Sequence, residues 1–435
     1  MNSDKEYIVS FIDAHEADFN KCAADIHAVP ELSLQEYKSA ALLEDLLESY
    51  GFTVERGLEG LPTAFRATYG NGKLKIGALC EYDALASLQQ DVGVTHKQGD
   101  GTPGHGCGHN LLGVGSAAAG IALKDLIDNH GLDATVVVYG TPAEEQYSGK
   151  TIMIRNGYFK ELDLVIAWHP LDRNLPGELS PKATRAFLLK FHGVAAHACN
   201  CPEKGISALD AAELTNIGVN YLREHVTRDC YMHYNYNNGG ERPNIVPDYA
   251  ELHYMVRSDD NDACVELQKK VERIAQGACM MTGATVESEM VSATMNGKIV
   301  FTLTKLAYES MCEIGAPQFD DADRAYAAEV AKNTGIAGVT GELDCSIEPA
   351  EGTVKVDNGS TDVGDVSHLV PTIYINTTCC GRFTPNHSWA MTTQTDRPAA
   401  FKGMNFAAKT LALVAAKVAR DPELFAKVKE EFDAK

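Results

Sequence analysis

The chain has 435 residues, of which 45% are hydrophobic and 23% charged, and its formal net charge is −22. This composition is ordinary for a soluble globular protein, and the length exceeds that of one typical core, so we expect two domains. The acidic balance argues against nucleic acid and an anionic membrane surface as partners, but not against a small anionic substrate held by a local arginine.

Helices and strands alternate in the N-terminal half. Ser33 and Glu36 have the spacing of a capping box, leucines then recur at helical spacing, and Gly51 supplies a stop. A buried helix is expected over residues 111–122. Strands are predicted for three short apolar runs, at residues 74–79, 135–139 and 164–167. A chemically distinctive motif follows each strand, at the sheet edge where open α/β proteins bind ligands.

The pattern changes near residue 186. From there the sequence predicts a strand at residues 187–191 and a helix at 208–222. A polar, aromatic stretch follows at 231–238, and then a strand that ends at 257. A helix at 263–281 and a last strand at 285–290 complete this part. This order resembles a ferredoxin-like α+β unit. Because helix–strand alternation resumes near residue 297, we predict an α/β domain formed by residues 1–185 and 297–435, with residues 186–296 inserted in it.

The N-terminus and the cysteines indicate a cytoplasmic protein. Residues 1–6 are polar and lead into no apolar signal region, and we find no run of about 18 apolar residues that would predict a membrane span. The 12 cysteines are scattered along a chain that is too long to need a disulfide framework. We therefore expect reduced thiols.

A cysteine and a histidine stand two residues apart in the glycine-rich turn 104–110. The Cys107 thiolate and the His109 imidazole are flanked by glycines and can converge on one metal ion. A buried free cysteine and a catalytic thiol are the alternatives. The mechanism of a thiol hydrolase does not require the glutamate pair described next. The pair therefore favours the interpretation of Cys107 as a metal ligand. The glycines match neither a phosphate loop nor a dinucleotide fingerprint.

Two adjacent glutamates, Glu144 and Glu145, follow a predicted strand and a Pro-Ala turn. On an exposed helix such a pair is usually solvated surface. At a sheet edge, neighbouring carboxylates repel each other unless a cation offsets their negative charges. One of them can then bind a metal while the other accepts a proton from water.

Three histidines and an arginine are weak evidence for a functional site when each is taken alone, and they gain weight only together. His169 ends an apolar strand and could be a core residue, and His387 lies in a Pro-Asn-His-Ser-Trp loop. His197 and Arg257 belong to the inserted segment and could be surface residues. Taken with the cysteine and the glutamates, the histidines supply enough ligands for two metal ions and leave one carboxylate as a base.

These motifs resemble the di-metal carboxypeptidase and aminoacylase superfamily, the M20 metallopeptidases. Within it they are similar to the amidohydrolase branch that has Cys-Gly-His in place of His-x-Asp, and to the aminobenzoyl-glutamate hydrolase type in that branch. The matching stretches run in order over almost the whole chain, at residues 27–33, 81–85, 107–113, 140–145, 168–170, 193–198, 242–247, 361–367 and 384–389.

The resemblance implies a site for two divalent metal ions, manganese or zinc. Cys107 would bridge the two ions. His109 and His169 would complete one position, and Glu145 and His387 would complete the other.

The resemblance also implies roles for residues around the metals. Glu144 would be the general base and then the acid that protonates the leaving amine. His197 would stabilise the oxyanion from the partner subunit. Asn244 and Arg257 would hold the carboxylate of the substrate, and Asn244 could do so across the dimer. Asp83 would orient a metal ligand.

The resemblance as a whole implies a metal-dependent amide hydrolase with a mixed-sheet catalytic domain and an inserted lid and dimerisation domain. The substrate would be a small amide with a free carboxylate: an N-acyl amino acid, an aminobenzoyl-glutamate-like conjugate or a small dipeptide. A homodimer is expected. Two alternatives stay open, namely a dipeptidase acting on β-alanyl or lysyl dipeptides and a non-catalytic partner in a hetero-oligomer.

Overall fold

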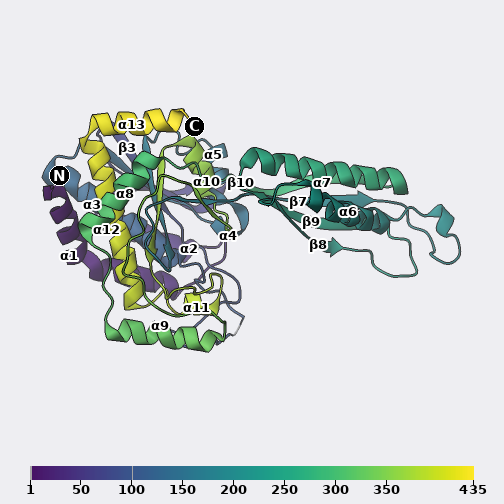
Figure 1. Cartoon of the computed structure of the whole chain (residues 1–435), viewed down its shortest axis with the longest axis horizontal. Helices are drawn as coiled ribbons and strands as arrows, with labels where there is room; N and C mark the ends of the chain where they lie inside the picture. The colour runs from purple at the N-terminus through teal and green to yellow at the C-terminus, as the bar shows by residue number, and fades with distance from the viewer. Residues whose placement is uncertain (1, 100) are drawn as a thin grey trace. The chain divides into compact units, whose positions relative to one another are not determined.

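The computed structural model describes residues 2–99 and 101–435, and the chain divides into two compact units. The first unit consists of residues up to 179 together with 298–355 and 366–435. The second unit consists of residues 180–297 and 356–365. The short segment 356–365 therefore belongs to the same unit as the inserted part of the chain. Both chain termini belong to the first unit (Figure 1).

The first unit is built on a six-stranded mixed sheet with the order β1-β2-β4-β3-β5-β12. The pairs β1–β2 and β2–β4 are antiparallel, whereas β4, β3, β5 and β12 run parallel to one another. The strands are β1 (Thr53–Leu58), β2 (Leu61–Gly70), β3 (Leu74–Cys80), β4 (Ala134–Gly140), β5 (Leu164–Leu171) and β12 (Thr372–Thr378). Every residue of β4 is buried, as its unbroken run of β-branched side chains predicts.

Helices cover this sheet, and α3 and α12 pack against each other and against its strands (Figure 1). The helices that lie wholly in the first unit are α1 (Asn2–His27), α2 (Tyr37–Ser49), α3 (His109–His130), α4 (Glu144–Tyr147), α5 (Gly149–Arg155), α8 (Phe301–Ile314), α9 (Asp321–Thr334), α11 (Trp389–Thr392), α12 (Pro398–Arg420) and α13 (Pro422–Asp433). Helix α10 (Val363–Leu369) begins in the second unit and ends in the first. Two short strands, β6 (Leu179–Pro181) and β11 (Lys355–Asp357), pair with each other.

Helix α3 is long and apolar enough to cross a membrane, contrary to the expectation that no such stretch occurs. Of its most apolar 18-residue window, 83% is buried inside the structure. Its neighbours are α1, α12 and strands of the sheet. Its composition is therefore that of a central core helix, and its first residue is His109.

The second unit has the predicted strand–helix–strand–strand–helix–strand order, and the aromatic stretch is a strand. Its antiparallel sheet has the order β10-β7-β9-β8. Helices α6 and α7 pack on β7 and β9, and alternate residues of β9 are buried beneath them (Figure 1). The elements are β7 (Ala183–His192), α6 (Ala208–Leu222), β8 (Tyr231–Asn238), β9 (Tyr249–Ser258), α7 (Asn261–Thr282) and β10 (Thr285–Thr294), with 3₁₀ turns at Pro202–Lys204 and Arg223–His225.

The predicted capping box at Ser33 and Glu36 is wrong. Helix α2 does begin after Glu36, but no side chain caps it. The Ser33 hydroxyl instead donates to Oδ2 of Asp83 at 2.8 Å, and Oε1 of Glu36 accepts from the backbone N–H of Ala143 at 2.9 Å. Both side chains are buried against loops at the end of the sheet, where long-range partners replace the local cap.

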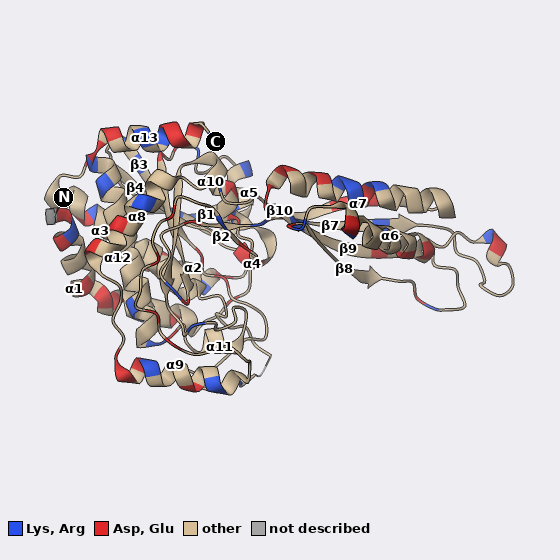
Figure 2. Ribbon diagram, viewed as in Figure 1, with Lys and Arg blue, Asp and Glu red and all other residues tan. Residues whose placement is uncertain are grey.

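Acidic and basic side chains are interspersed on the surface helices. Figure 2 shows both signs on α9 and α13. Several helices carry pairs at i and i+4, among them Lys21–Asp25 and Lys305–Glu309. Exposed pairs of this kind contribute little to stability.

Candidate metal centre

The predicted metal ligands converge at the carboxyl ends of three neighbouring parallel strands. The loops after β3 and β4 and the end of β5 meet there, because these strands are adjacent in the sheet and point the same way. Three sets of side chains place their ligand atoms within 4.8 Å of one another. They are Cys107 with His109 and His169, Cys107 with Glu145 and His387, and Glu81 with His109 and Glu144.

Cys107 is buried, and the turn that follows it is tight. Gly108 caps α3 in the left-handed region, with φ 80°, and a Cβ there would lie 2.7 Å from Cγ of Pro170. The turn therefore packs directly on β5. This packing brings Sγ of Cys107 to 3.3 Å from Nε2 of His169, two atoms that could share one metal ion.

Gly108→Ala is expected to lower the free energy of unfolding by about 2–3 kcal/mol, since the new methyl group combines a left-handed φ with a clash. Gly131→Ala is the matched control. Gly131 ends the same helix at φ 61°, but nothing lies within 4 Å of its Cβ position. Urea unfolding should show a larger loss for Gly108→Ala, and equal losses would refute the packing argument.

His109 is held so that one ring nitrogen faces the cluster. Its Nδ1–H donates to Oδ1 of Asp83 at 2.9 Å, and Asp83 also accepts from Ser33 and from the backbone N–H of Glu145. Nε2 of His109 and Oε1 of Glu145 lie 3.9 Å apart. Among the described residues neither atom has a hydrogen-bond partner, although both are buried. A cation would satisfy two such neighbouring polar atoms.

The ionisation of these groups supports the same fit. Burial raises the pKa of the Glu145 carboxyl to about 7, and burial also raises the pKa of the Cys107 thiol. Burial opposes the charge of His109, but the Cys107 sulfur and Asp83 raise the pKa of its ring well above the usual range. A bound cation would reverse this balance and stabilise the thiolate, the carboxylate and the neutral imidazole together.

His387 closes the cluster from a loop of the C-terminal part. Its backbone has a φ of 54°, and its N–H donates to the carbonyl of Gly106 at 2.9 Å, which ties this loop to the cysteine turn. Nε2 of His387 lies 3.5 Å from Oε2 of Glu145. The His387 side chain is 55% exposed, whereas the Glu145 side chain is 6% exposed. Within the first unit, this side of the cluster is therefore reachable from solvent.

Glu144 precedes Glu145 at the start of α4, after a residue with a left-handed backbone. Ala143 has a φ of 62°, and its N–H is fixed by the buried Glu36. This turn aims both glutamates at the cluster, where a carboxylate oxygen of Glu144 lies within 4.8 Å of ligand atoms of Glu81 and His109. The two carboxylates thus reach different members of the same cluster.

Three predicted residues, His197, Asn244 and Arg257, belong to the second unit. The Nδ1 atom of His197 accepts from the backbone N–H groups of Cys199 and Asn200 at 3.2 and 3.1 Å, so its proton is on the exposed Nε2. The carbonyl of Asn244 accepts from Ala198 N–H, which places Asn244 beside His197.

Arg257 lies at the opposite end of the sheet in this unit. It pairs with Thr184 on β7, whereas His192, eight residues along β7, leads into the His197 loop. At about 3.3 Å per residue, roughly 26 Å separates the two ends. The Arg257 guanidinium donates to the carbonyl of Asn358 at 3.1 Å, and burial lowers its pKa.

Two residues of the cluster were not predicted. Glu81 lies after β3 with Oε2 at 3.2 Å from Nε2 of His109, and Lys150 on α5 lies 2.6 Å from its other oxygen. Glu81 could have been predicted as a site residue, since it stands at a strand end two residues before Asp83. Nothing in the sequence marks Lys150 as part of the site.

His169 also differs from its predicted setting. It lies inside β5, which continues to Leu171, and not after the strand. Its Nδ1 lies 2.8 Å from the carbonyl of Pro170, and its Nε2 faces Cys107. Beyond Ala167 the pairing partner of β5 is β12, which carries the strand through Pro170.

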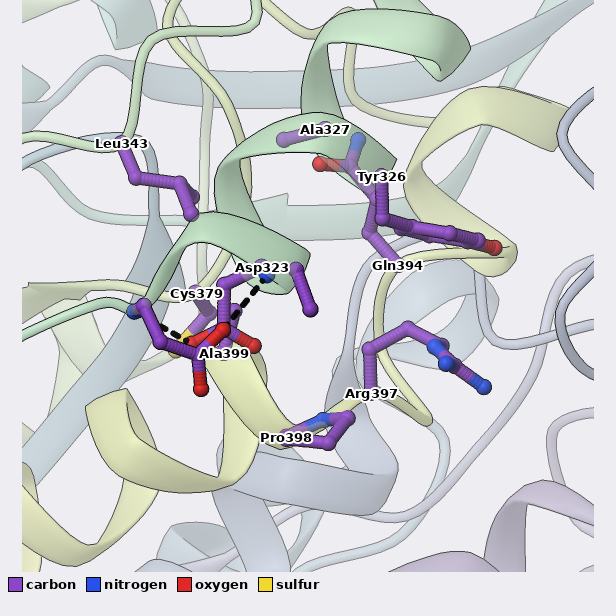
Figure 3. Close-up of a pocket in the computed structure, with 11 residues that line it drawn as sticks. Asp323, Tyr326, Ala327, Leu343, Cys379, Gln394, Arg397, Pro398 and Ala399 are labelled. Carbon is purple, nitrogen blue, oxygen red and sulfur yellow. Dashed lines mark hydrogen bonds between the residues drawn. The ribbon is translucent and has the colours of Figure 1, made fainter.

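A pocket of about 120 Å³ beside α9 is lined by other residues (Figure 3). Asp320 and Asp323 form the capping box of α9, and both pair with Lys402. The guanidinium of Arg397 lies over the Tyr326 ring, 4.7 Å from its centre. These side chains have structural partners, and none of the residues that line the pocket belongs to the metal cluster.

Comparisons with known proteins show which family the chain resembles. Residues 182–279 match the peptidase dimerisation domain of the M20 family. One of the subunits of the p-aminobenzoyl-glutamate hydrolase of Escherichia coli is 36% identical over 98% of this chain and 94% of its own length. The Xaa-Arg dipeptidase of Mus musculus is 31% identical over 94% of this chain and 88% of its own length.

A solved structure has the same fold at low sequence identity. It is a Bacillus subtilis protein described as a dinuclear metal binding peptidase from the M20 family, with a TM-score of 0.64, 17% identity, and coverage of 94% of this chain and 99% of its own. The fold class and the type of enzyme expected from the sequence are confirmed. The chain belongs to the M20 peptidase family and is an amidohydrolase.

Proposed function

We propose that this chain hydrolyses the amide bond of a small N-acyl or N-aryl-acyl amino acid by means of two divalent metal ions. The observation that carries the proposal is the convergence of Cys107, three histidines and Glu145 in one cluster, with Glu144 beside them. When bound, two such ions would polarise the scissile carbonyl and lower the pKa of water.

The distances support a ligand assignment. Cys107 is the proposed bridge, because its sulfur lies within 4.8 Å of the ligand atoms of His109 and His169 in one set and of Glu145 and His387 in another. His109 and His169 would complete one position, and Glu145 and His387 the other. A thiolate with imidazoles favours zinc or another borderline metal over magnesium, and manganese suits the carboxylate. The proposal is therefore zinc or manganese.

Glu144 moves the proton in this proposal. Its carboxylate accepts a proton from the attacking water as the new C–O bond forms. The same proton then passes to the amide nitrogen as the C–N bond breaks, so that an acid and an amine leave. The imidazole Nε2–H of His197 donates to the carbonyl oxygen while that oxygen carries negative charge.

Asp83→Asn is expected to weaken metal binding by about 10- to 100-fold, because the carboxylate that orients His109 is lost. Competition between a chromogenic chelator and the protein measures the affinity. Ser33→Ala is the matched control, since it removes one hydrogen bond to Asp83 and leaves the carboxylate in place. An Asp83→Asn protein with the affinity of the parent would contradict the role.

The separation of His197 from Arg257 supports a dimer. A small amide substrate is shorter than the roughly 26 Å of strand between the ends of the sheet. One substrate therefore cannot meet both residues of a single chain. We propose that Arg257 of one chain holds the substrate carboxylate as a bidentate donor, while His197 and Asn244 reach it from the second copy.

The substrate is proposed to be p-aminobenzoyl-glutamate or a close analogue, since the relative in E. coli named for that activity covers nearly the whole chain. Dipeptide hydrolysis is the second candidate, because a named dipeptidase is 31% identical. A metal-loaded single chain assayed on p-aminobenzoyl-glutamate, hippurate, Xaa-Arg, β-alanyl and lysyl dipeptides should show its highest kcat/KM with the first. No turnover on any of them would favour a non-catalytic role in a hetero-oligomer.

We also propose that the protein works in the cytoplasm. All 12 cysteines are free thiols, and Cys199 and Cys312 are exposed. Exposed free thiols and a thiolate metal ligand both suit a reducing compartment.

A further inference from the structure

A lysine and a glutamate form an ion pair in the interior of the first unit, beside the metal cluster. Nζ of Lys150 lies 2.6 Å from Oε1 of Glu81, and the two side chains are 0% and 1% exposed. Taking two charges out of water is costly, and a buried ion pair is weak evidence for a stabilising role. The position of the pair, more than its energy, suggests what it does.

The second oxygen of Glu81 faces a metal ligand. Oε2 lies 3.2 Å from Nε2 of His109. Because the other ring nitrogen of His109 donates to Asp83, Nε2 is the ring atom left to bind a metal ion. Nε2 is buried and has no hydrogen-bond partner among the described residues. A cation bound by Nε2 and by Oε2 of Glu81 would satisfy both atoms.

The distance itself suits a shared metal ion. Ligand atoms that bind one tetrahedral metal at about 2.0–2.3 Å lie about 3.3–3.8 Å from one another. The separation between Glu81 and His109 is close to this range, as is the 3.3 Å between Cys107 and His169. Glu81 and Lys150 are brought there by the ends of β3 and β4, the two strands whose loops also supply His109 and the glutamate pair.

We propose that Glu81 supplies Oε2 as a further ligand to the metal ion held by His109, and that Lys150 fixes Oε1 so that the carboxylate binds through one oxygen. This inference rests on the proposed function, since it requires that the cluster bind metal. Lys150 also offsets the negative charge that Glu81 adds to a cluster that already holds a thiol and other carboxylates. The pair thus tunes the charge and the ligand number of one metal position.

Loss of Glu81 should weaken metal binding, whereas loss of Lys150 should not. Glu81→Gln removes an anionic ligand and is expected to weaken one of the two metal ions at least tenfold. Lys150→Met removes a competing positive charge, so metal affinity should equal or exceed that of the parent. A pair with only a structural role would weaken binding in both variants or in neither.

Titration of the metal-free full-length chain with Co²⁺ tests this. Glu44→Gln is the matched control, because Glu44 is a buried carboxylate in an ion pair with Arg56 at 2.8 Å, outside the metal cluster, and should bind Co²⁺ like the parent. Any pattern other than weaker binding in Glu81→Gln with undiminished binding in Lys150→Met overturns the inference. A parent chain that binds no Co²⁺ would instead refute the proposed function.

A second measurement needs no variant. A crystal structure of the unchanged chain loaded with Co²⁺ should place Oε2 of Glu81 about 2.0–2.2 Å from the ion bound by His109. An ion bound by His109 with Oε2 farther than about 3 Å would overturn the inference even if both variants fail to fold.

Discussion

Glu144→Gln is expected to lower kcat by about 10²–10⁴-fold, the usual contribution of a general base and acid. The amide keeps the size of the side chain but cannot accept a proton from water. The metal content should be that of the parent, because Cys107, three histidines and Glu145 remain in place. Steady-state hydrolysis of p-aminobenzoyl-glutamate, together with metal analysis of the same sample, measures both quantities.

Glu309→Gln is a suitable control for this variant. Glu309 lies on α8 with a half-exposed side chain that pairs loosely with Lys305 at 4.0 Å, so its neutralisation should leave kcat unchanged. A Glu144→Gln protein with full activity would remove Glu144 from the mechanism. Loss of metal along with activity would instead make Glu144 a ligand.

His197→Ala is expected to lower kcat by about 10²–10³-fold with little change in metal content, since an oxyanion donor acts on the transition state. If His197 acts on the substrate of the second copy, two inactive variants can rescue each other. Mixing His197→Ala with Glu144→Gln after subunit exchange should produce heterodimers in which one of the two sites has both residues intact. Random pairing would then restore about a quarter of the parent activity.

The size of this rescue shows whether His197 acts on the substrate of the second copy or within its own chain. If His197 acts within its own chain, a heterodimer has no intact site, and the mixture stays as inactive as its components. His225→Ala is a control for the removal of a histidine from the same unit, because His225 is exposed in a 3₁₀ turn. It should leave kcat unchanged.

Much of the site was predictable because its signals are local in the sequence. The run of β-branched residues in β4 predicts a buried strand, and the glutamate pair follows it directly. The Cys-Gly-His turn stands at the start of an apolar helix that proves to be the central helix α3. Parallel strands bring such loops to one edge of the sheet, so the cluster follows from topology as well as from motif.

The parts that could not be predicted depend on partners far away in the sequence. Ser33 and Glu36 have capping-box spacing, but their partners are Asp83 and Ala143, 50 and 107 residues further on. Ser33 and Glu36 are buried at the site, and their hydrogen bonds to these distant partners replace the local capping box. The pair of Glu81 and Lys150 likewise joins positions 69 residues apart, and a lone lysine in a short helix carries no pattern that would indicate it.

The end of β5 was mispredicted for a different reason. A proline normally argues against the interior of a strand, because it lacks an N–H group. Pro170 is tolerated because β3 pairs with β5 only as far as Ala78 and Ile166, so that β12 alone continues alongside. The strand therefore continues past His169, whose Nε2 lies 3.3 Å from Sγ of Cys107.

The most direct test of the account is a metal titration of the full-length chain. The chain is stripped with a chelator, shown by mass spectrometry to be metal-free, and assayed on p-aminobenzoyl-glutamate as zinc or manganese is added back. The account predicts no hydrolysis without metal and activity that rises to a plateau at two ions per chain. Full activity in the metal-free chain would contradict it.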